Sequence, residues 1–246
     1  MPKSNMNTTL NYSPNFDVKK RGVKEIKFII FHYTGMKKEN QAITRLTSNK
    51  SKVSSHYLIK NNGEILSLVP DLYVAWHAGI SSWKKYKSIN KYSIGIEISN
   101  PGHENFYKKF SIKQIKSVLK LSSYLIKKYK IKSNFILGHS DIAPNRKKDP
   151  GEKFPWKYLS KNKIGYWHNL NEKKLVKKRN KKVDLIDMHK FIHNLYKIGY
   201  PKNIFLNKYK HSKQLTIAFQ RRFRQELVNG IIDQECLVIS NKLIKT

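Results

Sequence analysis

Two histidines and one aspartate in this chain have the types and positions of a metal-binding set. His32 follows the apolar run 28–31, and His139 closely follows a second apolar run at 135–137. Buried strands of this composition deliver the residues after them to a rim of a sheet. A loop punctuated by proline and glycine then returns Asp149 to a place beside His139. Two imidazoles and a carboxylate suit a catalytic zinc, which uses three protein ligands and leaves its fourth position to water.

Short strands must position these residues. The segments 24–34, 93–99 and 134–138 are apolar enough to form buried strands. The segments 56–59 and 64–69 are predicted to pair as a hairpin, because the Asn-Asn-Gly sequence between them tolerates positive φ. These strands predict one sheet with parallel and antiparallel members.

Alternation within one strand singles out a carboxylate. Along 93–99 the three isoleucines fall on one face, and Gly95 and Glu97 fall on the other. We therefore expect Glu97 to project away from the isoleucine face and into a groove.

Helices complete the predicted domain. The clearest is 111–130, where Ser111 and Gln114 have capping-box spacing and apolar residues recur at helical period. A shorter helix is expected over 39–48. Strands mixed with helices predict an α/β domain with a mixed central sheet flanked by helices.

Five segments between residues 23 and 157 together resemble the zinc-dependent N-acetylmuramoyl-L-alanine amidases of the amidase-2 type. That family includes envelope and peptidoglycan-recycling amidases and the peptidoglycan recognition proteins. Each segment alone is a weak signal, but five in the family's order are specific. The segments are 31–34 (FHYT), 54–59 (SSHYLI), 75–79 (AWHAG), 94–97 (IGIE) and the loop 139–151.

The resemblance implies a set of roles. It implies that His32, His139 and Asp149 bind one Zn²⁺ per chain. It further implies that Glu97 activates the water and serves as general base and acid, and that Lys147 stabilises the oxyanion. The implied substrate bond joins the lactyl group of N-acetylmuramic acid to L-alanine, in peptidoglycan or muropeptides. The intact catalytic residues favour hydrolysis, and a non-hydrolytic peptidoglycan-binding protein is the alternative.

Four further residues are candidates for substrate contact: Tyr33, Trp76, His77 and Asn100. Aromatic side chains such as Tyr33, Trp76 and Trp83 can stack on sugar or peptide, although aromatics more often belong to a core. His77 can line the groove or serve a structural role, and the sequence leaves both open.

A second unit follows the motifs, which end near Trp156. We predict a catalytic domain over 23–171 and a solvated linker over 172–183, whose first eleven residues include seven Lys or Arg. Apolar periodicity then predicts three helices within 184–246, beginning at Asp184 as N-cap. This small all-α unit resembles a peptidoglycan-binding module.

The charge of the chain is extreme. Its 246 residues include 50 Lys+Arg against 16 Asp+Glu, for a formal net charge of +34. Such a charge attracts polyanions such as nucleic acid, anionic lipid or an anionic cell wall. The lysines are scattered along the chain, so coding bias explains the charge equally well. Because no nucleic-acid-binding motif is recognisable, we predict no specific nucleic-acid partner.

The sequence says less about the cellular compartment of the protein. Cys236 is the single cysteine, so no intrachain disulfide is possible. No stretch approaches the roughly 20 apolar residues that cross a bilayer. Residues 1–22 are polar, without the apolar run of a secretory signal, and are predicted to form a flexible arm. The second unit favours the bacterial cell envelope or periplasm, with the cytoplasm as the alternative, and oligomeric state stays open.

Overall fold

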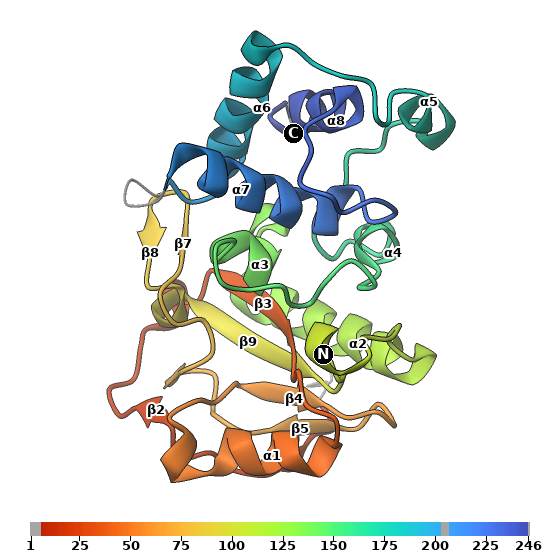
Figure 1. The fold of residues 1–246 in the computed structure, drawn as a ribbon. Coiled ribbons are helices and arrows are strands. Elements are labelled where there is room, and N and C mark those ends of the chain that lie inside the picture. The colour runs from red at the N-terminus through yellow and green to blue at the C-terminus, as the bar shows by residue number, and fades with distance from the viewer. Residues whose placement is uncertain (1–5, 203–206, 246) are drawn as a thin grey trace.

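A six-stranded sheet forms the centre of the protein in the computed structural model, which describes residues 6–202 and 207–245 (Figure 1). The strand order is β1-β5-β4-β9-β3-β10. Four strands, β4, β9, β3 and β10, run parallel, whereas β5 runs antiparallel to β4. The strands are β1 (Thr9–Leu10), β5 (Ile65–Ser67), β4 (Tyr57–Ile59), β9 (Ser93–Ile98), β3 (Phe28–Tyr33) and β10 (Ile136–Gly138). The predicted fold class is confirmed.

Strand β3 lies in the interior of the sheet. It pairs with β9 on one side and with β10 on the other, and its residues from Phe28 to His32 are buried. A strand covered on both faces must be apolar throughout, which accounts for its sequence Phe-Ile-Ile-Phe. Its register with β9 sets His32 directly opposite Glu97, so the two side chains lie on the same face of the sheet.

The two faces of the sheet carry different helices. On one face, Leu58 of β4 packs with Leu46 of α1 (Glu39–Thr47). On the other, Tyr57 and Ile59 join the main core with α2 (Ile112–Tyr129). Because Leu58 is also in register with Glu97, Glu97 projects toward the face that α1 covers.

The capping prediction for α2 is confirmed. The Ser111 hydroxyl accepts the Gln114 amide, and the Gln114 side chain accepts the Ser111 amide. These reciprocal bonds satisfy amide donors that a helix N-terminus leaves free.

Helices dominate the C-terminal part of the chain, which lies above the β10 edge of the sheet in Figure 1. Asp184 caps α6, as predicted, and Asn207 caps α7. Phe191 and Phe219 pack edge to face in the core between these helices. The helices are α3 (His139–Ile142), α4 (Trp156–Lys161), α5 (Glu172–Val176), α6 (Leu185–Ile198), α7 (Lys208–Phe223) and α8 (Gln234–Leu243).

The interval 172–183 differs from a solvated tether. Residues 172–176 form helix α5, and its Leu175 is buried. Arg179 pairs with Glu235 of α8 at 2.6 Å. Contacts of this kind attach the basic segment to the C-terminal part of the chain, which a composition dominated by lysine did not indicate.

The described part of the N-terminal segment is also ordered. Strand β1 pairs with β5, and β2 (Phe16–Asp17) pairs with β6 (Val74–Ala75). Arg21 is buried and donates hydrogen bonds to the Asp71 carbonyl. The predicted flexible arm thus contributes two short strands, at residues 9–10 and 16–17, to two different sheets, and residues 1–5 lie outside the described residues. A small hairpin, β7 (Ser82–Trp83) with β8 (Tyr86–Lys87), completes the strands.

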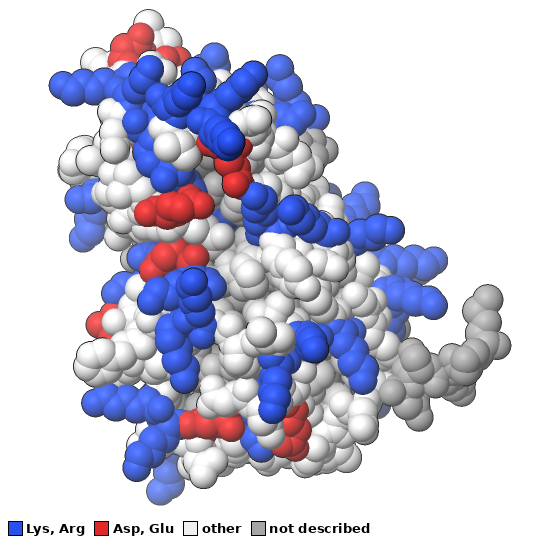
Figure 2. All heavy atoms as spheres, turned by 90° about the vertical axis from the view of Figure 1, so that its right-hand side faces the viewer, with Lys and Arg blue, Asp and Glu red and all other residues white. Residues whose placement is uncertain are grey.

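On the face that Figure 2 shows, basic side chains are spread out rather than gathered into one patch. Figure 2 shows Lys and Arg spread from the C-terminal helices at the top to the base of the sheet domain, with few acidic groups between them. None of the helices among residues 6–202 and 207–245 is long and apolar enough to cross a membrane.

Candidate metal centre

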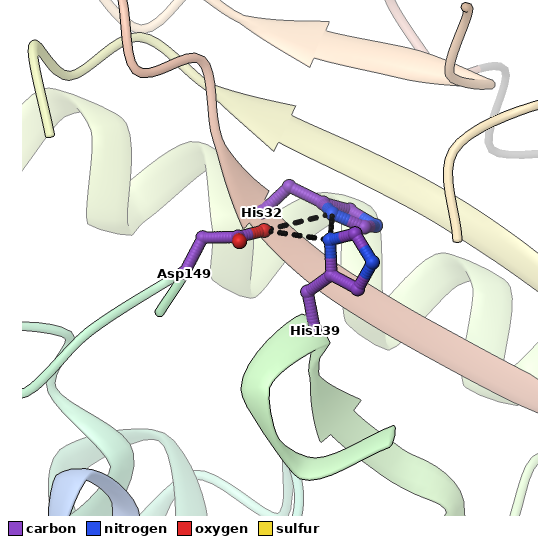
Figure 3. Close-up of side chains that lie close together, drawn as sticks. All are labelled: His32, His139 and Asp149. Atoms are coloured by element: carbon purple, nitrogen blue, oxygen red, sulfur yellow. Dashed lines mark hydrogen bonds and ion pairs between the residues drawn. The ribbon is translucent and has the colours of Figure 1, made fainter. Parts of the chain in front are cut away.

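His32, His139 and Asp149 converge on one point (Figure 3). His32 lies near the end of β3, His139 opens α3 directly after β10, and Asp149 lies in the loop that follows. The Nδ1 atoms of the two imidazoles are 2.9 Å apart, and each is 3.0 Å from Asp149 Oδ2. All three residues are buried. The predicted return of the loop to His139 is therefore confirmed.

The tautomer of His139 is set by the hydrogen bond that its Nε2 atom makes. His139 Nε2 lies 3.0 Å from the carbonyl oxygen of Ala78. A carbonyl can only accept, so Nε2 carries the hydrogen in the neutral imidazole. The Nδ1 lone pair is therefore directed at Asp149, as a metal ligand requires.

A chain of hydrogen bonds fixes His32 in the same way. The Ser93 hydroxyl donates to the Ile89 carbonyl at 2.8 Å, so Ser93 Oγ accepts from His77 Nε2 at 3.0 Å. His77 Nδ1 is then an acceptor, and it receives the Nε2 hydrogen of His32 at 2.9 Å. The Nδ1 lone pair of His32 is left for the site.

These groups fit a small divalent cation. Three acceptor atoms about 3 Å apart require a positive charge between them. A single proton bridges only one pair, whereas a metal ion contacts all three. Zinc bonds to nitrogen and oxygen are about 2.0–2.1 Å long, which places tetrahedral ligand atoms about 3.3 Å apart. The observed triangle is close to that size.

The protonation states agree with this fit. Burial, together with the neighbouring His139, lowers the pKa of His32 to about 4, so its imidazole is neutral at pH 7. Burial alone would raise the pKa of Asp149, but the two imidazoles outweigh it and hold that pKa well below its usual range. At pH 7 the set therefore offers a neutral imidazole from His32 and an ionised carboxylate from Asp149.

Glu97 is a carboxyl able to exchange a proton near neutral pH. Its Oε2 is buried and has no hydrogen-bond partner among the described residues. Burial and the charge of Asp149 raise the pKa of Glu97 to about 8. A general base or acid works best when its pKa is near the working pH. Glu97 has this property beside the three candidate ligands.

A groove opens over these groups. Its volume is about 400 Å³, and it is lined by His32, His139, Asp149, Glu97 and residues of α1. Lys147 also lines it, and its positive charge opposes the rise in the pKa of Glu97. The groove thus brings together all five residues predicted to bind metal or act in catalysis.

Three of the four predicted substrate contacts line the same groove. The Tyr33 hydroxyl bonds His103 at 2.8 Å, and the Trp76 indole donates to Asp17 at 2.7 Å. Their polar ends are engaged within the chain, which holds the two rings in place at the groove. Both nitrogens of His77 are engaged as well. The bonds of His77 support a role in positioning His32.

Asn100 and Trp83 lie away from the groove lining. Asn100 is buried, where its amide nitrogen donates to the Lys108 carbonyl and its oxygen accepts the Gly102 amide. Trp83 is buried and packs edge to face on Tyr200. Their contacts hold a loop and a core, respectively.

Sequence reasoning missed the support around the ligands, above all Gly95, Ser93 and Arg222. A Cβ on Gly95 would lie 2.4 Å from the His77 ring, so glycine is required where that ring packs on β9. A glycine inside a strand marks such a close approach, and that signal was available in the sequence. Nothing in the sequence pointed to Ser93 or Arg222.

Comparison with known proteins gives consistent matches. Residues 22–152 match the family model described as N-acetylmuramoyl-L-alanine amidase. The chain is 33% identical over 232 residues to N-acetylmuramoyl-L-alanine amidase AmiD of Escherichia coli, covering 89% of this chain and 83% of AmiD. A solved complex of AmiD with the substrate anhydro-N-acetylmuramic acid-L-Ala-D-gamma-Glu-L-Lys has a TM-score of 0.79, 33% identity, and coverage of 90% and 89% of the two chains.

A second group of relatives matches a smaller share of this chain. A solved AmpD derivative has a TM-score of 0.56 and 27% identity, and the match covers 93% of that chain but 63% of this one. Among curated sequences, 1,6-anhydro-N-acetylmuramyl-L-alanine amidase AmpD of Haemophilus influenzae is 32% identical, covering 60% of this chain and 88% of AmpD.

Proposed function

Because this chain belongs to the N-acetylmuramoyl-L-alanine amidase family of the amidase-2 type, we propose a metal-dependent hydrolysis at the site described above. The bond cleaved is the amide between the lactyl group of N-acetylmuramic acid and L-alanine. The observation that carries this function is the convergence of His32, His139 and Asp149 beside Glu97, whose buried Oε2 has no hydrogen-bond partner among the described residues. The neighbouring AmiD structure holds a substrate of this class.

We infer that the ion is Zn²⁺, one per chain, held by His32, His139 and Asp149. The donor set of two imidazoles and one carboxylate suits zinc and leaves room for one further ligand. A bound zinc ion would polarise the scissile carbonyl and lower the pKa of a water molecule from about 15.7 to about 7.

Glu97 moves the proton. Its raised pKa lets the carboxylate accept a proton from the attacking water and later release it to the leaving amine. Proton transfer by a positioned group contributes about 10²–10⁴-fold to a rate. The register of β9 with β3, which sets Glu97 opposite His32, supports this role.

Lys147 places a cation at the groove. Its ammonium would stabilise the negative oxygen that develops as the carbonyl is attacked, a contribution of about 3 kcal/mol if it equals other oxyanion donors. Tyr33 and Trp76, which line the groove, would contact the sugar or the stem peptide. Asn100 and His77 act instead through the loop and the ligand that they hold.

The C-terminal unit, residues 184–246, is proposed to bind peptidoglycan, and the basic surface would strengthen attachment to an anionic wall. We place the protein in the cell envelope on this basis. Fractionation of producing cells, with the protein followed by immunoblot, tests the placement, and recovery wholly in the cytoplasmic fraction contradicts it.

The function is tested with purified muropeptides and whole sacculi, analysed side by side by mass spectrometry. Release of the stem peptide is expected, with loss on chelation and recovery on addition of zinc. Glu97→Gln should lower the turnover by about 10²–10⁴-fold while zinc stays bound. The matched control is Glu64→Gln, a surface carboxyl paired with Lys60, which should behave like wild type. Activity that persists after complete metal removal would rule the proposal out.

A further inference from the structure

Arginine 222 connects the C-terminal helices to the start of the loop that carries two candidate ligands. From α7, its Nη1 donates to Asp141 Oδ2 at 2.6 Å, and its Nη2 donates to the Ile136 carbonyl at 2.9 Å. Asp141 is two residues from His139, and its Oδ2 also accepts the Gly138 amide at 2.8 Å. The arginine therefore holds both the end of β10 and the first turn of α3.

The surroundings of this pair make it specific. Arg222 and Asp141 are each only 1% exposed. The guanidinium lies 4.3 Å from the centre of the Trp156 ring and 5.0 Å from that of Tyr166. Tyr200, which precedes α7, donates to the other oxygen of Asp141 at 2.9 Å. A buried charge pair costs several kcal/mol in desolvation per ion and is retained only with such additional bonds.

The same helix and the residues just beyond it touch the loop at two later points. Gln214 donates to the Asn145 carbonyl at 3.3 Å. Gln225 donates to the carbonyls of Glu152 and Phe154 at 2.7 Å each. Figure 1 shows α7 lying directly over α3. The C-terminal unit thus contacts the segment 136–154 before, within and after the part that carries His139, Lys147 and Asp149.

We propose that α7 is a positioning element of the metal centre, with Arg222 as its principal residue. The inference rests on the proposed function only in taking His139 and Asp149 as metal ligands. Both lie outside the regular strands, so the sheet alone does not fix their separation. An unsupported loop would lose conformational freedom when it binds metal, and that ordering lowers affinity. Contacts from α7 order the loop beforehand.

A second buried arginine, two positions after Arg222, supplies a matched control. Arg224 forms an equally buried pair with Asp233, but its partners Leu227, Asn229 and Asp233 all belong to the C-terminal unit. Arg222→Met and Arg224→Met therefore each break one buried arginine–aspartate pair of this unit. Only the first removes a contact with the ligand loop.

The experiment measures zinc affinity of the full-length protein by chelator competition, and hydrogen exchange of amides 139–149 in the metal-free protein. Arg222→Met should weaken zinc binding by about 10–100-fold, the usual loss when a group that orients a ligand is removed, and should accelerate exchange in the loop. Arg224→Met should change affinity by less than about threefold, with loop exchange as in wild type. Circular dichroism confirms that both variants are folded.

Two further variants test the inference if Arg222→Met does not fold. Arg222→Lys keeps the charge but loses the second donor to Ile136, and Gln225→Leu removes only the contacts at the far end of the loop. Each should weaken zinc binding more than Arg224→Met does. Wild-type affinity in the Arg222 and Gln225 variants, or an equal loss in Arg224→Met, would overturn the inference. A wild-type protein without zinc binding would instead refute the proposed function.

Discussion

The two sides of the metal centre are supported in different ways. On the sheet side, His32 is fixed by β3 and by the hydrogen-bonded series through His77 and Ser93 to the backbone of Ile89. On the loop side, His139 and Asp149 follow β10 in a segment held by α7. One side is thus determined within the sheet domain, and the other depends on helices more than 50 residues further along the chain.

This difference follows from the contacts of the C-terminal unit with the ligand loop, which are the basis of the positioning role proposed for α7. In this chain the C-terminal unit holds the loop side through Arg222. Variants on each side can therefore separate the two kinds of support by their effects on metal binding.

Removing a ligand from either side should have the largest effect. His32→Ala and Asp149→Ala each leave two protein ligands, fewer than the three that a catalytic zinc site uses. Both variants should contain essentially no zinc after dialysis and should be inactive, as measured by elemental analysis and by peptide release. Near-stoichiometric zinc in His32→Ala would show that the loop side binds the ion alone, and the two sides would not form one site.

Removing His77 should weaken metal binding without disturbing the loop. His77→Leu leaves the Nε2 hydrogen of His32 without its acceptor, so zinc affinity should fall by about 10–100-fold. Loop exchange at 139–149 should stay as in wild type, in contrast to Arg222→Met. His168→Leu, which removes another buried histidine that accepts a backbone amide, is the control and should bind zinc normally. Faster loop exchange in His77→Leu would mean that the two sides are not separate.

Ser93→Ala should have a smaller effect on the same side. The His77 Nε2 hydrogen loses its acceptor, and a buried donor without a partner costs about 1–3 kcal/mol of stability. The imidazole of His77 remains in place, so zinc affinity should fall by less than about tenfold. Thermal unfolding and chelator competition measure the two quantities. A loss as large as that in His77→Leu would show that the hydroxyl alone sets the tautomer of His32.

Glu97→Gln should leave zinc affinity nearly unchanged but alter the pH dependence of stability in the metal-free protein. The pKa of Glu97 is about 8 in the folded protein, raised from the ordinary value of 4.5 for a glutamate carboxyl. Between these values the folded state binds more protons than the unfolded state, so this group lowers the free energy of unfolding as pH rises. Glu97→Gln removes this loss of stability at higher pH.

Urea unfolding from pH 5 to pH 8 tests this point. The stability of Glu97→Gln relative to wild type should increase across the range. Because Asp149 contributes to the raised pKa of Glu97, the increase should be smaller in an Asp149→Asn background. If the increase is the same in the Asp149→Asn background, the Asp149 carboxylate lies too far from Glu97 to belong to the same site.

Much of the sheet domain was predictable because its signals are local. The apolar run of β3 and the capping box of α2 each depend on residues within a few positions of one another, and the same holds for the Asp184 cap of α6 in the C-terminal unit. The segments 6–22 and 172–183 were harder, because their order comes from single buried groups such as Arg21 and Leu175. Those groups lie among charged residues that have the composition of solvated segments.

The ligand types, the order of the motifs and the alternation that turns Glu97 away from the isoleucines can all be read from the amino-acid sequence. The contacts of His77 with His32, and of Arg222 with the segment that carries His139 and Asp149, become apparent in the folded chain. The reason is physical: a hydrogen bond between side chains 45 residues apart, or an ion pair between residues 81 apart, leaves no periodic trace in composition. Such bonds form only when the packing of sheet and helices brings the groups together.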